Sequence, residues 1–578
     1  MKRLISFFAT LAIAAFFFVS CGGNDTKKLT PEEQFKIALS KYFVDNSKLF
    51  ANGLSQIKDT VNLSNYGEDF VVGVEVGDAA QTLINSILSE SDLNLDTKWL
   101  KNVQVGVTAG LTDNAVQFNV KAGLNKTDIV SVNVYEDSTN NTVYFSIPEL
   151  IKNNFKISEE EFGVSVRQLM NDYLAQVSFM GSVPEEVVFT GLIEEFVNAM
   201  ANSVGTVERN LEEIKAGMNG GKEVSAQYTV LSAKLDEDFG AKFASAAQNV
   251  IKTSTNFNGI ANWVVPVLSK LEGEKIRVKE FTEAIAEEVS DSIEDAFCYG
   301  SDELVLKLYV DSKSNIAGAT LVIEDEGTIN ILMPQNGKNF GFTLNAVEYG
   351  ESPIVAWNGY GTYTNGKMTG DFKLFVEGEE AVAFETKEFD ITSLKSVKAN
   401  GAITIHPKSE MRDASKDFLE DEFDLDYDML SLFDNLDVTI SMTQKDYNSA
   451  SVELAFTNGN SKFVSLTAKN TVSKPGSIKM PANDIFELNE DSIENYEEIL
   501  DGISTSQIVE NLKKAKVAPE YLEPLESLTG EMLGELVDDY FGGSSNSYNY
   551  YDDYYDYYDD GYDDGYDDDY YDYDDYWW

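Results

Sequence analysis

The sequence contains one histidine, His406, so any chemistry that needs an imidazole base depends on this residue. A serine hydrolase would pair the histidine with a nucleophile in a Gly-x-Ser-x-Gly turn, and the sequence contains no such turn. His406 stands between Ile405 and Pro407 at the end of an expected strand. This position indicates a structural histidine.

The two cysteines, Cys21 and Cys298, are too few for a zinc site of the Cys/His type. Cys298 follows Ala296 and Phe297 at the end of a helical pattern, which is typical of a buried small hydrophobe. The alternative for Cys298 is a reactive thiol.

Carboxylates are so abundant that no pair stands out as an acid/base couple. Asp424, Asp426 and Asp428 have the spacing of the first ligands of a calcium loop, but Met429 and Asn435 replace the glycine and the bidentate glutamate of such a loop. An acidic helix start is therefore favoured there. We expect no catalytic residue, no cofactor and no metal, with a carboxylate-based hydrolase as the alternative to a non-enzymatic protein.

The charge balance restricts the partners. Asp and Glu number 98 against 44 Lys and Arg, which gives a net charge of −54. Nucleic-acid affinity depends largely on basic residues, so we expect no nucleic-acid partner.

The N-terminus has the pattern of a secretory signal. Lys2 and Arg3 precede an apolar run from Leu4 to Val19, which is shorter than the roughly 20 residues of a transmembrane helix. A permanent transmembrane helix is the alternative. We expect residues 1–20 to be the signal peptide.

The run ends in Phe18-Val19-Ser20-Cys21-Gly22, which resembles the lipobox of bacterial lipoproteins, with Phe18 in place of the commoner leucine. The resemblance implies cleavage before Cys21, attachment of diacylglycerol to its thiol, further acylation such as palmitate on the new amino terminus, and a tether over residues 21–29. Two or more acyl chains make stable membrane anchors. An unlipidated secretory cysteine is the alternative. Acylation of Cys21 would leave no cysteine pair for a disulfide.

The lipobox also bears on location. By analogy with lipoproteins of two-membrane bacteria, Gly22 instead of Asp does not resemble an inner-membrane retention signal. We expect an anchor in the outer membrane or on the cell surface, or on the outer face of the cytoplasmic membrane if the host has one membrane.

Residues 30–300 read as a helix-rich α+β subdomain. A helix begins at the capping sequence Thr30-Pro31-Glu32-Glu33, and residues 103–147 alternate apolar with polar as in an antiparallel meander. Helical spacing returns from 148 to about 217, and a strand is expected at 223–235 before further helices.

Residues 301–541 read as an antiparallel-sheet subdomain closed by C-terminal helices. Up to eight strands are expected between 303 and 407 and three more between 436 and 469. Asn336-Gly337, Asn365-Gly366 and Asn458-Gly459 indicate two-residue hairpins of type I′.

Runs of strands followed by runs of helices indicate an α+β fold with long antiparallel β-meanders packed with helices. This alternation, with Gly-Lys-Met-Thr-Gly-Asp-Phe at 366–372, resembles the curved sheet over helices of lipoprotein carriers and mycobacterial lipid-transfer lipoproteins. The resemblance implies a hydrophobic ligand on the concave sheet face.

Residues 542–578 form an acidic tail composed almost wholly of Asp and Tyr after a Gly/Ser-rich linker. Aliphatic residues are absent and the aspartates repel one another, so we expect disorder. The tail is suited to basic proteins or to weak capture of divalent cations.

Together these patterns predict a non-enzymatic, lipid-anchored envelope or surface lipoprotein of unknown ligand. The alternative is a carrier of lipids or other hydrophobic ligands.

Overall fold

A computed structural model describes residues 29–60, 65–90, 97–163, 165–171, 183–218, 220, 222–297, 304–324, 326–348, 352–408, 436–459, 461–475, 477–489 and 502–526. The signal peptide, Cys21, Cys298, the Asp424 to Asp428 segment and the acidic tail lie outside these residues.

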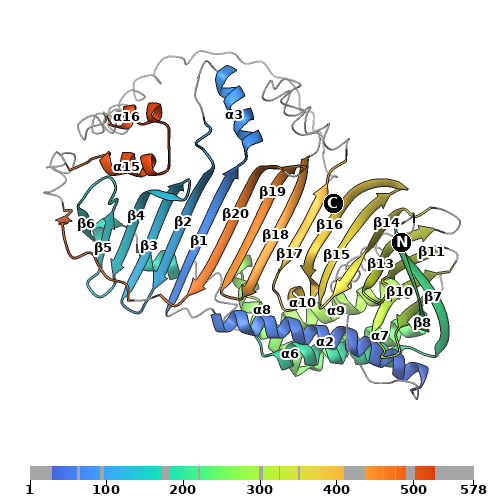
Figure 1. The fold of residues 1–578 in the computed structure, drawn as a ribbon. Helices are drawn as coiled ribbons and strands as arrows, with labels where there is room; N and C mark the ends of the chain where they lie inside the picture. Colours follow the sequence, from blue (N-terminus) through green and yellow to red (C-terminus); the bar gives the residue numbers. More distant parts are fainter. Residues whose placement is uncertain are drawn as a thin grey trace, which may run out of the picture.

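The architecture is a single long sheet with helices along both edges where the strands end and at one end of the sheet, which confirms the predicted α+β class (Figure 1). The strands are β1 Tyr66–Val76, β2 Asn102–Leu111, β3 Ala115–Leu124, β4 Thr127–Asp137, β5 Thr142–Ser146, β6 Asn154–Ser158, β7 Val207–Met218, β8 Lys222–Leu235, β9 Leu304–Val310, β10 Ile316–Ile323, β11 Gly327–Leu332, β12 Gln335–Asn336, β13 Asn339–Glu348, β14 Val355–Thr364, β15 Lys367–Val376, β16 Glu379–Asp390, β17 Gly401–His406, β18 Leu436–Asp446, β19 Ser449–Asn458, β20 Ser461–Ser473 and β21 Ile485–Glu487.

The described helices vary from three to thirty residues. They are α2 Pro31–Thr60, α3 Asp78–Glu90, α4 Glu159–Phe162, α6 Glu186–Ser203, α7 Glu237–Thr253, α8 Thr255–Glu272, α9 Val278–Phe297, α10 Ile391–Lys395, α15 Ser506–Lys514, the 3-10 helix η2 Pro519–Tyr521 and α16 Glu523–Glu526.

Neighbouring strands follow the chain from β7 through β11 and β13 to β20, and then continue with β1 to β6. The junction is the pairing of β1 with β20, in which Val74 lies opposite Leu466. The predicted N-terminal and C-terminal meanders therefore belong to one sheet. The pairing of β8 with β9 also crosses the expected boundary between residues 300 and 301.

The alternation of apolar and polar residues gives the sheet two unlike faces. Apolar residues of neighbouring strands lie opposite one another on the same face, and together they form a row that crosses many strands. In the middle of the sheet this row contains Phe372, Phe384, Ile405, Val438, Phe456, Val464 and Val76. We call this side the apolar face and the other the polar face.

Segment 207–218 corrects the expectation of helical spacing up to about residue 217. It forms β7, whose whole length pairs with β8 from Val207 opposite Ala233 to Met218 opposite Lys222. Helix-forming residues such as Glu212 and Glu213 are accommodated because pairing and burial of Ile214 override local propensity. Segment 154–158, also expected to be helical, forms β6.

The Asn-Gly turns agree with the prediction at one position and differ at the other two, because Asn458, like Asn336, pairs with the residue three positions further on. Asn365 and Gly366 have φ of 53° and 83°, as a type I′ turn requires, and they join β14 to β15. In the hairpin of β12 and β13, Asn336 pairs with Asn339, so Gly337 and Lys338 are the central residues. The predicted Asn336-Gly337 turn is thus displaced by one residue.

Candidate functional site

At one end of the sheet, helices α2, α6, α7 and α9 bury the apolar face. Leu231 of β8, Leu308 of β9 and Leu321 of β10 contact a cluster that includes Phe35 of α2 and Phe239 of α7. Leu308 is only 4% exposed. This end is a filled interface between sheet and helices.

The same face is open over six consecutive strands, β19, β20, β1, β2, β3 and β4. Eight large apolar side chains of this face are between 37% and 46% exposed: Phe70, Val72, Val103, Val105, Phe118, Val132, Val452 and Leu466. They are neighbours across strands, with Val72 opposite Val105 and Val74 opposite both Val103 and Leu466. We call this region the open apolar face.

Most of the backbone hydrogen bonding beneath these side chains is satisfied by strand pairing, although β5 pairs with β4 only from Asn133 to Asp137. Each of the six strands has a paired strand on both sides, from β18 beside β19 to β5 beside β4. The open apolar face therefore presents aliphatic and aromatic surface and offers an occupant few hydrogen bonds. Contiguous exposed patches of this kind commonly mark sites of interaction.

Segment 165–171 bounds one end of the open apolar face. Its Met170 is 7% exposed and lies in a cluster with Tyr66, Leu111 and Val116, which belong to the apolar face. The segment thus covers the edge of the sheet where β1 and β3 begin and β2 ends.

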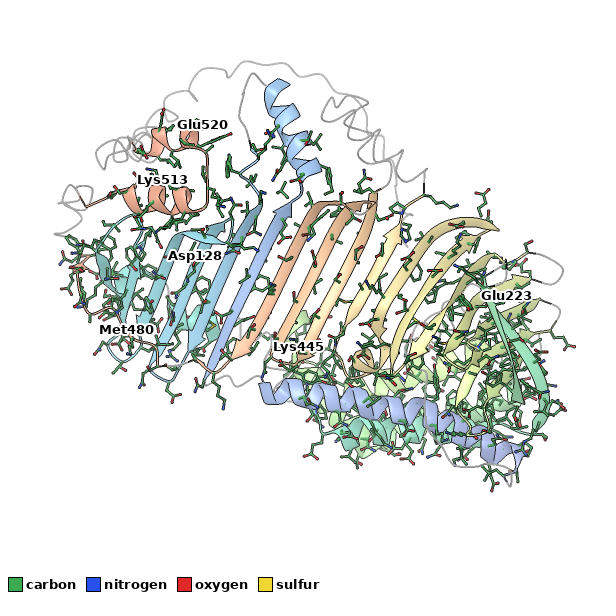
Figure 2. All side chains as sticks on the ribbon, in the orientation of Figure 1. Asp128, Glu223, Lys445, Met480, Lys513 and Glu520 are labelled. Atoms are coloured by element: carbon green, nitrogen blue, oxygen red, sulfur yellow. The ribbon has the colours of Figure 1, made fainter. Side chains whose placement is uncertain are left out.

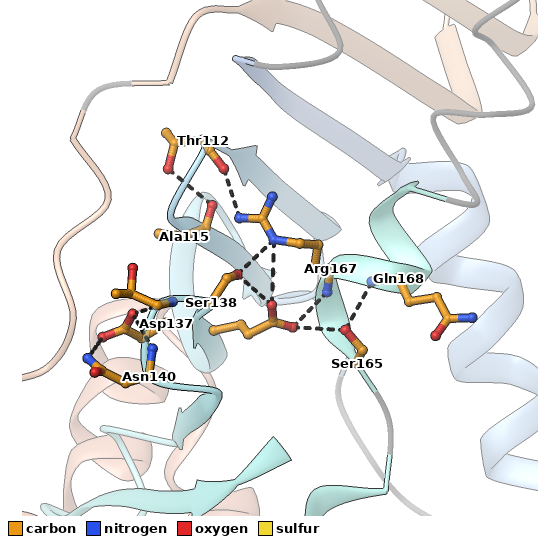
Figure 3. Close-up of polar contacts among 10 residues, drawn as sticks. Thr112, Ala115, Asp137, Ser138, Asn140, Ser165, Arg167 and Gln168 are labelled. Atoms are coloured by element: carbon orange, nitrogen blue, oxygen red, sulfur yellow. Dashed lines mark hydrogen bonds and ion pairs between the residues drawn. The ribbon is translucent and has the colours of Figure 1, made fainter. Parts of the chain in front are cut away.

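A buried ion pair fastens this segment to β4 (Figure 3). The Glu136 side chain is 1% exposed and lies 3.7 Å from Arg167 Nε. Glu136 accepts hydrogen bonds from the Arg167 backbone N–H at 2.7 Å and from Ser138 Oγ at 2.7 Å. Arg167 also donates to Ser138 Oγ and to the carbonyl oxygen of Thr112, at 2.7 and 2.8 Å. The carboxylate is therefore both paired and hydrogen-bonded, as a buried charge requires.

At the other end of these strands, the open apolar face is bounded by residues 506–526 (Figure 2). Trp99 stacks edge-on against Tyr521, with ring centroids 5.3 Å apart, in a cluster that includes Leu124 of the apolar face. Asn125 Nδ2 donates to the carbonyl oxygens of Trp99 and Ala515, at 2.6 and 2.7 Å. Described segments therefore pack against the apolar face at both ends of β3.

The polar face of these strands carries cross-strand pairs. Lys462 Nζ lies 2.7 Å from Glu453 Oε1 and 3.0 Å from Glu75 Oε2, and so joins β19, β20 and β1. The hydrogen bond from Lys462 lowers the pKa of Glu453 below its ordinary value. Such cross-strand pairs stabilise the sheet.

His406 lies between two carboxylates on β16 and β18. Its Nδ1 is 2.9 Å from Asp437 Oδ1, and its Nε2 is 3.6 Å from Glu385 Oε1. These contacts hold the ring to its neighbouring strands. Within the described ranges, no group of three or more His, Cys, Asp or Glu residues could hold a metal ion.

The sequence indicated the alternation that creates the open apolar face but not its exposure. Val103, Val105 and Val107 alternate with polar residues, which predicts one buried side for β2. Tertiary packing decides which strands are covered by a helix and on which side. No local signal in the sequence indicates this.

Comparisons with known proteins add nothing to the α+β class that the structure shows. No protein-family model matches the chain, and no curated protein matches it. Among solved structures, the crystal structure of isotype 1 transferrin binding protein B from serogroup B Neisseria meningitidis covers 71% of this chain and 76% of its own. The sequence identity is 8% and the TM-score is 0.10, so the match carries no argument.

None of the helices in the described part of the chain is long and apolar enough to cross a membrane.

Proposed function

We propose that this protein is a non-enzymatic lipoprotein, anchored through acylated Cys21 in the outer membrane or on the cell surface, that holds acyl-bearing ligands on the open apolar face. The observation that carries the binding role is the change along one sheet face from helix-covered, around Leu308, to open, around Val105. The anchor is supported by the lipobox-like sequence that ends at Cys21.

An acyl chain suits the composition and size of the surface. Its floor consists of valine, leucine, alanine and phenylalanine side chains with a paired backbone beneath them, so an occupant gains free energy mainly by burying apolar area. Six strands about 4.8 Å apart span about 24 Å. One leaflet of a bilayer is about 15 Å of hydrocarbon, so an ordinary acyl chain fits across these strands.

The expected affinity is modest. Full burial of one methylene group of the ligand contributes about 0.8 kcal/mol to the free energy of binding. An acyl chain that lies on an open face buries about half of its surface. A dozen methylenes would then contribute about 5 kcal/mol, which corresponds to a Kd of about 0.2 mM. Such binding allows exchange with a membrane.

The ligand experiment uses the full chain with Cys21→Ala and a fluorescent fatty acid. The double variant Val72→Thr/Val105→Thr adds a hydroxyl to two facing partners in the open apolar face. Affinity should fall about fivefold, because two half-buried methyl groups are lost. The control is Val71→Thr, the adjacent residue of β1 on the polar face, which should bind as the parent does. Equal binding by all three proteins would overturn the ligand proposal.

A separate experiment addresses the anchor. Wild type and Cys21→Ala are expressed in a bacterium, fractionated and weighed by intact mass spectrometry. A mass that begins at Cys21 with added acyl chains, lost in the variant, is expected. An unacylated wild-type mass that retains residues 1–20 would contradict the anchor but not the ligand proposal.

A further inference from the structure

A pocket of about 540 Å³ lies at the edge of the sheet beside α10, between β15, β16, β17 and β18. Four lysines line it: Lys367, Lys387, Lys398 and Lys445. They come from three strands and from the loop after α10, and Figure 2 shows Lys445 at the edge along which α2 runs. In a chain with a net charge of −54, this gathering of cations differs from the average surface.

The two carboxylates of the pocket are already engaged. Glu388 lies 3.3 Å from Lys367 Nζ. Asp390 caps α10 by accepting hydrogen bonds from the backbone N–H and the hydroxyl of Ser393, at 2.8 and 2.7 Å. Lys387, Lys398 and Lys445 have no carboxylate within ion-pair distance among the described residues. Three such ammonium groups in one pocket attract an anion.

Lys398 is held in place by its loop. Val397 has a φ of 58°, which is unfavourable for a β-branched residue, and the turn is fixed by hydrogen bonds from Val397 N–H to Leu394 O and from Lys398 N–H to Ser393 O. Lys398 Nζ lies 5.3 Å from the centre of the Tyr447 ring, a cation-π contact. Backbone strain of this kind persists where surrounding contacts enforce it, and it often accompanies binding sites.

We propose that this lysine pocket binds the phosphate group of a small molecule or lipid headgroup. Phosphate concentrates up to two negative charges on three oxygens, which suits several separate ammonium donors. The volume is within the range of small-molecule sites and leaves room for the group that carries the phosphate. The lysine pocket shares no residue with the open apolar face, so this proposal stands or falls separately from the ligand proposal.

The test measures binding of inorganic pyrophosphate to the full chain with Cys21→Ala, by calorimetry at low salt. Lys387→Ala/Lys445→Ala should weaken binding about tenfold, since two charge-assisted contacts are lost. The control, Lys126→Ala/Lys338→Ala, removes the same charge from two exposed lysines that have no ion pair among the described residues. It should bind as the parent does.

A second arm identifies the source of the phosphate, with phosphatidylglycerol vesicles in a flotation assay. Vesicle binding that the pocket variant loses and the control variant keeps would support a lipid headgroup, even if pyrophosphate binds weakly. Pyrophosphate binding without vesicle binding would support a soluble phosphorylated ligand. Equal weakening by both double variants, or no binding of either probe by the parent, would overturn the proposal.

Discussion

Two regions of this sheet carry the same apolar pattern but are stabilised in different ways. Around β9, four helices cover the apolar face and Leu308 is 4% exposed. Around β20, the same face is open and Leu466 is 42% exposed. The comparison shows that alternation in the sequence specifies a face of a strand, whereas the covering elements decide whether that face becomes core or surface.

The two regions must therefore derive their stability from different interactions. The covered end gains from burial of leucine and phenylalanine side chains, at about 25 cal/mol per Å² of apolar area. The open region depends more on its strand pairing and on polar cross-strand contacts such as Thr108 Oγ1 to Asp69 Oδ1, at 2.7 Å. An exposed apolar face lowers the solubility of a protein. Its presence is therefore one reason to assign it a function.

The largest expected effect compares two leucines in the two regions. Leu308→Ala should lower the free energy of unfolding by about 3 kcal/mol, because it leaves a cavity beneath the helices. Leu466→Ala should cost about 1 kcal/mol or less, because that side chain is already half exposed. Urea unfolding of both variants checks this. Similar losses would mean that the open apolar face is covered in solution, and the comparison would fail.

The next effect concerns the attachment of segment 165–171 to the sheet. Arg167→Ala leaves Glu136 buried beside fewer donors and should destabilise the attachment of segment 165–171 by about 3 kcal/mol. Hydrogen exchange measured by mass spectrometry should become faster in this segment and in the adjoining start of β3. Arg277→Ala, which breaks the exposed Arg277–Glu280 pair, is the control and should cost below about 1 kcal/mol. An unchanged rate of hydrogen exchange at 165–171 would show that the ion pair does not hold this segment on the sheet.

Much of the strand pattern could be predicted from the sequence, because period-two alternation and turn residues are local signals. Strand β9, from Leu304 to Val310, lies within the region 303–407 in which strands are predicted. The strand β7 was missed because its Glu-rich sequence favours a helix and only its pairing with β8 decides otherwise. The β1 to β20 junction joins residues about four hundred positions apart, and no local pattern encodes such a contact.

The candidate sites were harder to predict for the same reason. The lysines of the pocket extend from Lys367 to Lys445 in the sequence and converge only after four strands and a loop are in place. The open apolar face is defined by the exposure of residues such as Val105, over which none of the described helices packs, and this is a property of the whole fold. The lipobox-like sequence at Cys21 is contiguous, so the anchor is a prediction from the sequence alone.

The smallest expected effect tests the polar face of the open region. Lys462→Met should lower the free energy of unfolding at neutral pH by less than about 1 kcal/mol, because Lys462, Glu453 and Glu75 are each a third or more exposed. The folded-state pKa of Glu453 lies below the ordinary value, so its contribution is present above the unfolded-state pKa and is lost as pH falls through the folded-state pKa.

The difference between wild type and Lys462→Met should therefore disappear in acid, as measured by unfolding midpoints across the acid range. Lys121→Met is the control, since Lys121 lies 3.5 Å from Asp128 with both side chains about half exposed, and it should have the smaller effect. A constant difference at every pH would mean that Lys462 acts through packing of its aliphatic stem. The open region would then be held by strand pairing and apolar contacts, without a measurable contribution from this ion pair.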